Sequence, residues 1–335
     1  MTADRLLLLD SASLYFRAFY GVPDQRADPA SEPPTNAVRG FLDMLSSLVE
    51  RYRPTHVAAC WDNDWRPQWR VEAIPTYKSH RLAPGSDPTA PGGVAGAGPA
   101  PAAGRTVEEA PDDLAPQVPI IASALAAVGI VRVGVDGYEA DDVIGALARR
   151  YRGTMPVDVV TGDRDLFQLV DDAHGVRIIY TARGGVRDAD VVDEAFLRDK
   201  YGVADGAAYA DLAVLRGDPS DGLPGVAGIG EKTAAALLDT FGSLTAIQQA
   251  LSDGDPRIKG AQRTRLLAGA AYLQVAPAVV RVAADSPVPE LDLRIPAAVA
   301  DPALLSRLAV EHRLTGTFNR LLSAVRLGDP GRAGE

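Results

Sequence analysis

The sequence predicts an α/β fold with a mainly parallel central sheet, followed by a helical region. In the first half of the 335-residue chain, short apolar runs alternate with segments of helical apolar spacing, a pattern typical of β–α units. Beyond about residue 205 the spacing becomes helical, with Gly-rich turns and few strand signals. A chain of this length with 47% hydrophobic residues is able to bury a substantial core.

Four apolar runs are candidate strands, and one segment between them is a clear helix candidate. The candidate strands are Leu6–Leu9, Val57–Trp61, Val157–Val160 and Val176–Tyr180. Segment Asn36–Tyr52 carries apolar side chains at helical spacing, and Thr35 or Asn36 is suited to cap its first turn. This order of elements supports the parallel sheet.

Two segments lack a structural pattern. Eighteen of the 22 residues at 83–104 are Gly, Ala or Pro, and Asp87 is their one charged residue. Such a segment buries too little apolar surface to offset its ordering entropy, so we predict a flexible loop. Residues 327–335 are predicted to form a disordered tail.

The composition excludes several classes of protein. A single Cys rules out a disulfide framework and fits a reducing compartment. The N-terminal segment lacks the cationic start of a signal peptide, and no run of about 18 apolar residues occurs. We therefore expect a cytoplasmic protein with no membrane association.

The formal net charge of −10 argues against a nucleic-acid partner, but the distribution of charge is uneven. Residues 51–81 carry six basic side chains against three acids, and residues 257–265 carry four against none. Taken alone, such runs are more often a solvated surface than a binding site, so only other evidence can assign them to nucleic-acid binding.

Acidic residues follow the predicted strands. Asp10, Asp62 and Asp163 come at or just after the ends of three strands, and ligands of parallel α/β sheets bind beyond these carboxyl ends. Other acids occur where a helix begins, in a Gly- and Pro-rich turn, and in the Asp-Arg-Asp triplet. The full set is Asp10, Asp62, Glu139, Asp141, Asp142, Asp163, Asp165, Asp218 and Asp221.

The set indicates a metal site more strongly than any single member does. One Asp beside Gly or Pro is ordinarily a cap or turn residue. Nine carboxylates on one rim repel each other unless cations lie between them. Oxygen ligands without His or thiolate favour Mg²⁺ or Mn²⁺, and two such ions about 4 Å apart are suited to in-line attack on a phosphodiester.

Other chemistries lack their motifs. No phosphate-binding G-x-x-x-x-G-K-[ST] loop occurs, so we expect no nucleotide cofactor. No G-x-S-x-G elbow occurs, and Cys60 falls inside a predicted strand, where packing explains it.

Five segments, in order, resemble the bacterial 5′-nucleases, which are flap endonucleases and 5′→3′ exonucleases found alone or as the N-terminal domain of DNA polymerase I. The segments are LLLLDSASLYFRAFY, WDNDWRPQWRVEAIPTYKSHR, GYEADDVIGALA, TGDRDLFQLV and GDPSDGLPGVAGIGEKTAAALL. The resemblance implies a PIN-like core and a helix-hairpin-helix-like region, and it extends from about residue 5 to about residue 285. Since no polymerase segment follows, we expect the stand-alone form.

The resemblance also implies a division of the acids between two Mg²⁺ or Mn²⁺ ions, with a third ion as an option. One ion would be held by Asp10, Asp62 and Asp141, with Glu139 reaching it directly or through water. The other would be held by Asp163, Asp165 and Asp221. Asp142 and Asp218 would be outer ligands or ligands of the additional ion.

Basic and aromatic positions of the family are also filled. Lys78 and Arg81 match residues that contact the scissile phosphate from the arch helix, where positive charge stabilises the phosphoryl oxygens. Arg70 matches a further phosphate-contacting position. Phe16 matches an aromatic residue that stacks on the base beside the cut, although aromatic side chains at helical spacing also suit a core.

Segment GVAGIGEKTAAALL resembles the family's hairpin element, which also holds K⁺. Backbone N–H groups of Gly228, Ile229 and Gly230 would face a phosphate of duplex DNA, although an ordinary turn has the same sequence signs. Nearby basic residues favour DNA binding: Lys232, Arg257, Lys259, Arg263 and Arg265. The Gly/Ala/Pro tract departs from the helix-forming arch of the family and leaves threading of 5′ ends open.

We therefore predict a monomeric, structure-specific 5′ nuclease that acts on DNA with 5′ flaps, nicks or 5′ ends during primer removal and repair. Its parts would be a metal-binding core at 1–205, a DNA-binding region at 206–290 and helical packing at 291–326. Three alternatives stay open: a PIN-like RNA nuclease, a DNA-binding protein with little activity, and a small phosphatase. The hairpin element and the complete acidic set disfavour them.

Overall fold

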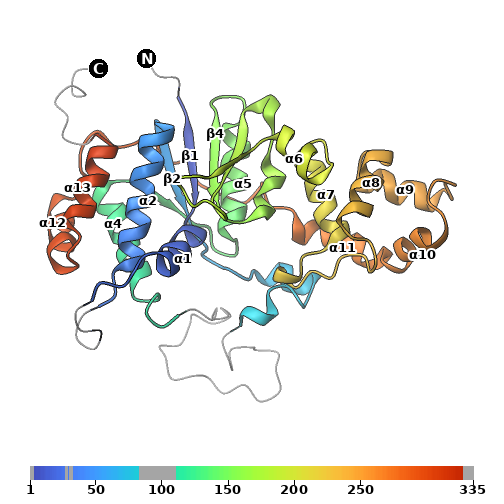
Figure 1. Ribbon diagram of the computed structural model, residues 1–335, viewed down its shortest axis with the longest axis horizontal. Helices are drawn as coiled ribbons and strands as arrows, with labels where there is room; N and C mark the ends of the chain where they lie inside the picture. The colour runs from blue at the N-terminus through green and yellow to red at the C-terminus, as the bar shows by residue number, and fades with distance from the viewer. Residues whose placement is uncertain (1–3, 27–28, 30–32, 83–110, 327–335) are drawn as a thin grey trace.

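The computed structural model describes residues 4–26, 29, 33–82 and 111–326 (Figure 1). The predicted loop at 83–104 and the predicted tail at 327–335 lie outside these residues. In the described part, six strands form one sheet in the order β3-β2-β1-β4-β5-β6. The strands are β1 (Leu6–Asp10), β2 (His56–Cys60), β3 (Val131–Val133), β4 (Val157–Thr161), β5 (Val176–Tyr180) and β6 (Asp190–Val192).

The sheet is parallel except at one edge. β1 pairs in parallel with β2 on one side and with β4 on the other, so that Leu8 lies opposite both Ala58 and Val159. Only β6 runs antiparallel, against β5. Every residue of β1 is buried, as expected for a continuous apolar strand covered on both faces. The predicted α/β fold with a mainly parallel sheet is confirmed.

Helices cover both faces of the sheet. One face buries the side chains of Leu7 and Leu9 against α1 (Ser11–Gly21), α2 (Asn36–Tyr52) and α4 (Gln117–Val128). The other face buries Leu6 and Leu8 against α5 (Ala140–Tyr151). Alternation of the β1 side chains therefore divides the apolar core into two layers.

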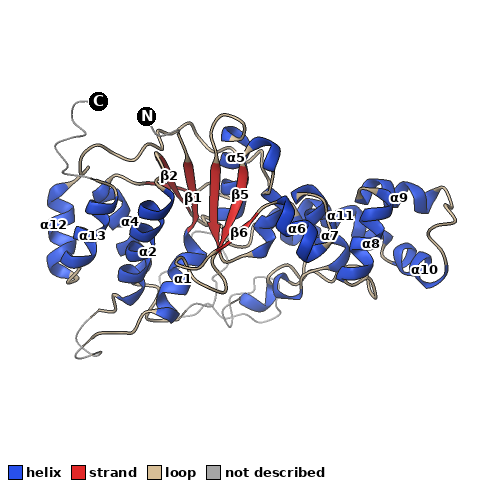
Figure 2. Ribbon diagram, turned by 45° about the horizontal axis from the view of Figure 1, so that its top comes forward, coloured by secondary structure: helices blue, strands red, loops and turns tan. Residues whose placement is uncertain are grey.

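Beyond about residue 205 the described chain is helical, as predicted, and helices α6 to α11 extend away from the sheet (Figure 2). The short helix α3 comes earlier in the chain, after β2, and α6 to α11 form the extension. Their bounds are α3 (Gln68–Ala73), α6 (Glu194–Tyr201), α7 (Gly206–Arg216), α8 (Glu231–Phe241), α9 (Leu244–Ser252), α10 (Gly260–Ala268) and α11 (Ala270–Val280). The apolar core of this extension is continuous with the layer under α5.

The chain then returns to the opposite end of the sheet. Helices α12 (Pro302–Glu311) and α13 (Thr315–Ala324) pack against α4 and α2. Phe318 and Leu321 of α13 are buried in the same layer as Phe41 of α2. In the described residues, no helix is long and apolar enough to cross a membrane.

The predicted strands and helix agree closely with the structure, and two strands were missed. Segment Asn36–Tyr52 is helical over its full predicted length, although the Thr35 side chain makes no capping hydrogen bond. The missed strands, β3 and β6, have three residues each. Both contain exposed or half-exposed positions, so their apolar signal is weak.

We predict that Phe318→Ala lowers the free energy of unfolding by about 3–5 kcal/mol, because it empties a buried aromatic site between α13 and α2. Urea denaturation of the whole chain measures this loss. The exposed neighbour is the control: Asn319→Ala should leave stability nearly unchanged. Equal, small losses for both variants would show that the C-terminal helices do not stabilise the core.

Candidate active site

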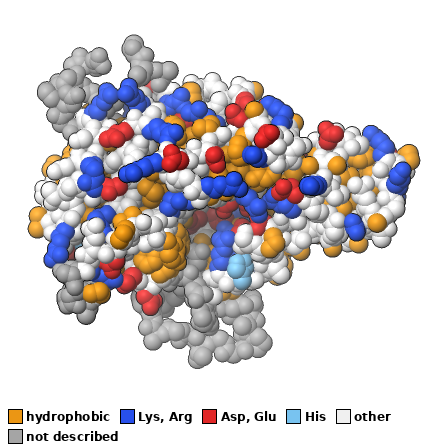
Figure 3. All heavy atoms as spheres, in the orientation of Figure 1, with side chains coloured by type: hydrophobic (Ala, Val, Ile, Leu, Met, Phe, Trp, Pro, Cys, Tyr) orange, Lys and Arg blue, Asp and Glu red, His pale blue; other side chains and the backbone are white. Residues whose placement is uncertain are grey.

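The predicted convergence of carboxylates at the carboxyl edge of the sheet is confirmed. Asp10 ends β1, while Asp62 and Asp163 each come two residues after the neighbouring strands β2 and β4. The start of α5 adds Glu139 and Asp141. All five residues line one pocket of about 520 Å³, and Figure 3 shows acidic side chains deep in a recess with basic side chains around it.

Two hydroxyl side chains hold the ends of β1 and β4 together. Thr161 Oγ1 donates to Asp10 Oδ2 at 2.6 Å and accepts from the backbone N–H of Asp163 at 2.8 Å. Ser13 donates its backbone N–H to Asp10 Oδ1 at 3.1 Å, and its Oγ accepts from the N–H of Gly162 at 2.7 Å. Asp10 and the Asp163 backbone are thus held by fixed hydrogen bonds.

Burial and repulsion between neighbouring carboxylates raise the pKa values of two of these acids. Burial raises the pKa of Asp10 to about 7, the hydrogen bond from Thr161 opposes the rise, and the charge of Asp62 adds to it. Burial likewise raises the pKa of Asp141 well above its ordinary value, with Asp10 and Asp163 contributing. These are the conditions under which a cation among the carboxylates is strongly favoured.

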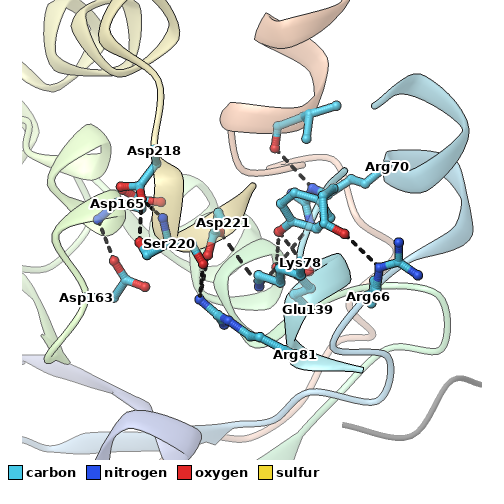
Figure 4. Close-up of polar contacts among 12 residues, drawn as sticks. Arg66, Arg70, Lys78, Arg81, Glu139, Asp163, Asp165, Asp218, Ser220 and Asp221 are labelled. Atoms are coloured by element: carbon cyan, nitrogen blue, oxygen red, sulfur yellow. Dashed lines mark hydrogen bonds and ion pairs between the residues drawn. The ribbon is translucent and has the colours of Figure 1, made fainter. Parts of the chain in front are cut away.

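Glu139 is held by an aromatic and a basic side chain (Figure 4). The buried Tyr77 hydroxyl lies 2.9 Å from both Glu139 oxygens, and Lys78 Nζ donates to Oε2 at 2.9 Å. Burial raises the pKa of Glu139 to about 7 against the opposing effect of Lys78. Burial alone would lower the pKa of Lys78, but Glu139, Tyr77 and Asp221 together raise it well above its usual range.

A second group of acids lies beside the first. Asp163 accepts from the backbone N–H of Asp165 at 2.8 Å. Asp165 Oδ1 is buried without a hydrogen-bond partner. Asp218 accepts from Arg164 at 2.8 Å, and Asp221 accepts from Arg81 at 2.6 Å.

The segment that carries Lys78 and Arg81 docks on the turn that carries Asp221. The N–H of Lys78 donates to the Asp221 carbonyl at 2.9 Å, and Thr76 Oγ1 donates to the Gly222 carbonyl at 2.7 Å. A Cβ at Gly222 would lie 2.0 Å from the Thr76 carbonyl oxygen. The two segments therefore approach as closely as a glycine permits.

The expected arch helix does not carry the basic pair. Lys78 has left-handed backbone geometry with φ 47°, and Ser79–Arg81 forms a single 3-10 turn. The docking of this segment on the Asp221 turn determines its course. Both side chains nevertheless line the pocket.

Five of the predicted catalytic and metal-binding residues do not line the pocket: Arg70, Asp142, Asp165, Asp218 and Asp221. Asp165, Asp218 and Asp221 lie beside it, whereas Arg70 and Asp142 are enclosed by the protein. Arg70 is 2% exposed and donates to Asp142 at 2.9 and 2.6 Å, and Asp142 is 0% exposed. Phosphate contact by Arg70 and cation binding by Asp142 do not suit these buried positions. The cause is packing of α3 against α11, which encloses both side chains.

The nine acids divide by their partners. Glu139, Asp142, Asp218 and Asp221 pair with basic side chains. Within the residues that the structure describes, Asp10, Asp62, Asp141, Asp163 and Asp165 form no ion pair. As the described side chains stand, no three Asp, Glu, His or Cys groups are close enough to hold a metal ion. The all-oxygen donor set and the unpartnered Asp165 oxygen still fit a hard divalent cation.

Sequence reasoning missed several residues of the pocket. Phe16 is half-buried and lines the pocket as predicted, but Trp65, Tyr180 and Arg164 line it too. Trp65 stands three residues after Asp62, and Arg164 stands inside the Asp-Arg-Asp triplet. The signal that could have identified both residues is their closeness in sequence to acids that follow strand ends.

The hairpin element lies at the start of α8. Gly228 and Gly230 are exposed, and Ile229 is buried. One of the three N–H groups expected to face a phosphate is already engaged, because the N–H of Ile229 donates to the Val226 carbonyl at 2.9 Å. Lys232 is exposed on the first turn of α8.

The predicted basic run lies around α10, close to the hairpin. Arg265 donates to the Gly228 carbonyl at 3.1 Å, which connects α10 to the hairpin. Lys259 is exposed directly before the helix, and Arg263 is half-buried within it. Arg257 pairs with Asp255 at 2.7 Å, so its charge is partly balanced.

A mostly parallel sheet that gathers carboxylates at its carboxyl edge, with Lys and Arg side chains beside them, defines the class of metal-dependent nucleases. Within that class, the chain belongs to the 5′-3′ exonuclease family. Residues 5–202 match the family's N-terminal resolvase-like domain, and residues 204–299 match its C-terminal SAM fold. The predicted family is thereby confirmed.

Known relatives span nearly the whole chain. A 5′-3′ exonuclease of Streptomyces coelicolor is 55% identical over 95% of this chain and 99% of its own length. A 5′-3′ exonuclease of Mycobacterium tuberculosis is 46% identical over 96% and 97%. The fold is shared with the bacteriophage T5 D15 flap endonuclease, in a pseudo-enzyme-product complex with DNA and metal ions. That structure has a TM-score of 0.60 and 16% identity, and the match covers 96% of this chain and 99% of the other.

We predict that Gly222→Ala separates the Lys78 segment from the Asp221 turn and destabilises the fold. Gly254→Ala is the matched control, since it has a similar positive φ but no atom within 4 Å of the added Cβ. The left-handed conformation should cost the control about 1–2 kcal/mol in urea denaturation, and the clash should cost Gly222→Ala at least twice as much. Equal losses would mean that the close contact is dispensable.

Proposed function

We propose that this chain hydrolyses DNA phosphodiesters at single-strand/duplex junctions, acting on 5′ flaps, nicks and 5′ ends. The observation that carries the proposal is the pocket of unpaired carboxylates with Lys78 and Arg81 beside it. The names of its relatives support an activity that proceeds from 5′ ends. The T5 D15 flap endonuclease, which shares the fold, was crystallised with DNA and metal ions.

Two groups of acids would hold divalent cations of the Mg²⁺ or Mn²⁺ type. Asp10, Asp62 and Asp141, assisted by Glu139, form the first group. Asp163, Asp165 and Asp221 form the second, and Asp218 is an outer or additional ligand. Such cations, when bound, offset the carboxylate charge and provide Lewis-acid activation.

Lys78 and Arg81 would bind the phosphoryl oxygens of the scissile phosphate. Lys78 keeps its proton in the acidic surroundings, because Glu139 and Asp221 hold its pKa high. Both side chains already lie beside the acids of the site. Lys78 Nζ is 2.9 Å from Glu139, and the Arg81 guanidinium is 2.6 Å from Asp221. Their positive charge would stabilise negative charge that develops on the phosphate during cleavage.

Aromatic side chains at the pocket would orient the substrate. Phe16 and Trp65 both line the pocket, so either ring can stack on the base next to the cut. Stacking tolerates any base, which suits an enzyme that recognises DNA structure and not sequence. The half-buried position of Phe16 supports a role at the pocket over one in the core.

The hairpin and α10 would hold the duplex, in a region that we place at residues 206–290. Gly228 and Gly230 leave the backbone accessible to a phosphate, and Lys232 and Arg265 add positive charge. A K⁺ ion at the hairpin is part of this proposal. The core at 1–205 would cut, and the protein would act as a monomer.

The decisive test is cleavage of nicked duplex DNA that carries a 5′-labelled flap, in Mg²⁺ or Mn²⁺. We expect cutting at the junction, and its loss in EDTA. Asp163→Asn should lower the rate at least roughly 100-fold, since even outer partners of metal ligands cost about 10- to 100-fold. Asp199→Asn, whose carboxylate is 76% exposed on α6, should retain the wild-type rate.

Two outcomes of this assay would contradict the proposal. Tight DNA binding without cleavage in either metal would leave a structure-specific DNA-binding protein. Cleavage of RNA strands alone would favour the PIN-like RNA nuclease.

We predict that Lys232→Gln weakens duplex binding equally for all sequences. Loss of one phosphate contact should reduce the slope of log affinity against log salt by about 0.9. Fluorescence anisotropy in EDTA at several salt concentrations measures this slope. Arg149→Gln, an exposed charge near the far end of α5, should leave it unchanged, and a similar effect of both variants would indicate nonspecific attraction.

A further inference from the structure

The buried pair of Arg70 and Asp142 joins three parts of the chain. Arg70 belongs to α3, and Asp142 lies in the first turn of α5. Besides its two bonds to Asp142, Arg70 donates from Nε to the Val279 carbonyl at 3.1 Å, at the end of α11. Asp142 in turn accepts from the N–H of Ala283 at 2.7 Å. The pair therefore ties α3, the start of α5 and the segment after α11 together.

Asp142 also sets the backbone of the residues that line the pocket. Its Oδ2 accepts from the N–H of Glu139 at 3.1 Å, in a capping box at the start of α5. Asp141 is its immediate neighbour. Four donor groups thus converge on the Asp142 carboxylate: the N–H of Glu139, the N–H of Ala283 and two nitrogens of Arg70.

A substrate phosphate cannot use Arg70 in this arrangement. The side chain is buried and does not line the pocket. Its guanidinium lies over the Trp69 ring at 4.4 Å, and each of its three nitrogens donates to an acceptor of the protein. Removal of a positive charge from this position should therefore not remove a contact with DNA.

We infer that Arg70 is a positioning residue, which holds Glu139 and Asp141 in place for cation binding. It acts through Asp142 and through its own ion pair with Glu139 at 3.4 Å. The inference rests on the proposed function, because it assigns those two acids to the cation site. It replaces the expected phosphate contact of Arg70 with an internal one. It also makes the end of α11, which belongs to the helical region, part of the support of the acidic pocket.

Three variants test the inference in the full-length protein: Arg70→Gln, Asp142→Asn and the double variant. The first measurement is Mn²⁺ binding by calorimetry without DNA. We expect each single variant to weaken Mn²⁺ binding about 10- to 100-fold, as for other outer partners of metal ligands. The double variant should be little worse than either single variant, since both break one interaction.

The second measurement separates positioning from phosphate contact. Duplex affinity in EDTA, and its salt dependence, should match the wild type in all three variants. A salt slope lowered by about 0.9 in Arg70→Gln, with unchanged Mn²⁺ affinity, would show a phosphate contact and overturn the inference.

A matched variant controls for simple loss of stability. Asp158 is a buried carboxylate near the start of β4, far along the strand from the pocket, and Arg177→Gln removes one of its two arginine partners. This variant should reduce stability and leave Mn²⁺ affinity unchanged. Reduced stability with unchanged Mn²⁺ affinity in Arg70→Gln as well would reduce the pair to a structural role and overturn the inference.

If Arg70→Gln does not fold, Arg70→Lys answers the same question. It keeps the charge and loses the paired geometry of the guanidinium, so we expect weaker Mn²⁺ binding. Wild-type Mn²⁺ affinity in Arg70→Lys would contradict positioning by the guanidinium. Because Mn²⁺ binding is measured without DNA, failure of flap cleavage and failure of this inference remain distinguishable.

Discussion

The parallel pairing of β1 between β2 and β4 is the constraint on which the rest of the structure depends. It brings the ends of three strands to one edge, and Asp10 stands at the end of the middle strand. Both faces of β1 must then be covered, because all five of its side chains are buried. The two apolar layers, and the return of α12 and α13 to the outer side of α2 and α4, follow from that requirement.

The same strand pairing concentrates negative charge at the carboxyl edge of the sheet, and the acids there fall into two groups. Four acids pair with fixed basic side chains, as Asp218 does with Arg164. The other five have no such partner among the described side chains, and burial raises the pKa of Asp10 to about 7. Asp10 is the buried member of this group, and a buried carboxylate without a basic partner is costly, so the hydroxyl of Thr161 holds it in place. The unpaired group is where cation binding gains most.

The sequence predicted the elements with strong periodic signals and the edge at which acids meet. Asn36–Tyr52 was found because its apolar stripe is long, and Asp163 because it follows a buried apolar run. The strand β3 was missed because three residues, one of them the exposed Arg132, give no period. Partners were not predictable, since Arg70 and Asp142 are 72 positions apart and only tertiary packing brings them together.

The acidic site is not a property of the sheet domain alone. Asp221 lies in the part of the chain that matches the family's C-terminal domain, while Asp10 and Asp163 lie in the N-terminal one. The turn of Asp221 docks on the Lys78 segment through the glycine at 222, and Arg70 ties α11 to α5. A shift of the helical region would therefore displace Asp221 and strain the support of Glu139. The proposed duplex-holding hairpin belongs to that same region, so under this proposal the position of bound DNA would be mechanically linked to the geometry of the carboxylates.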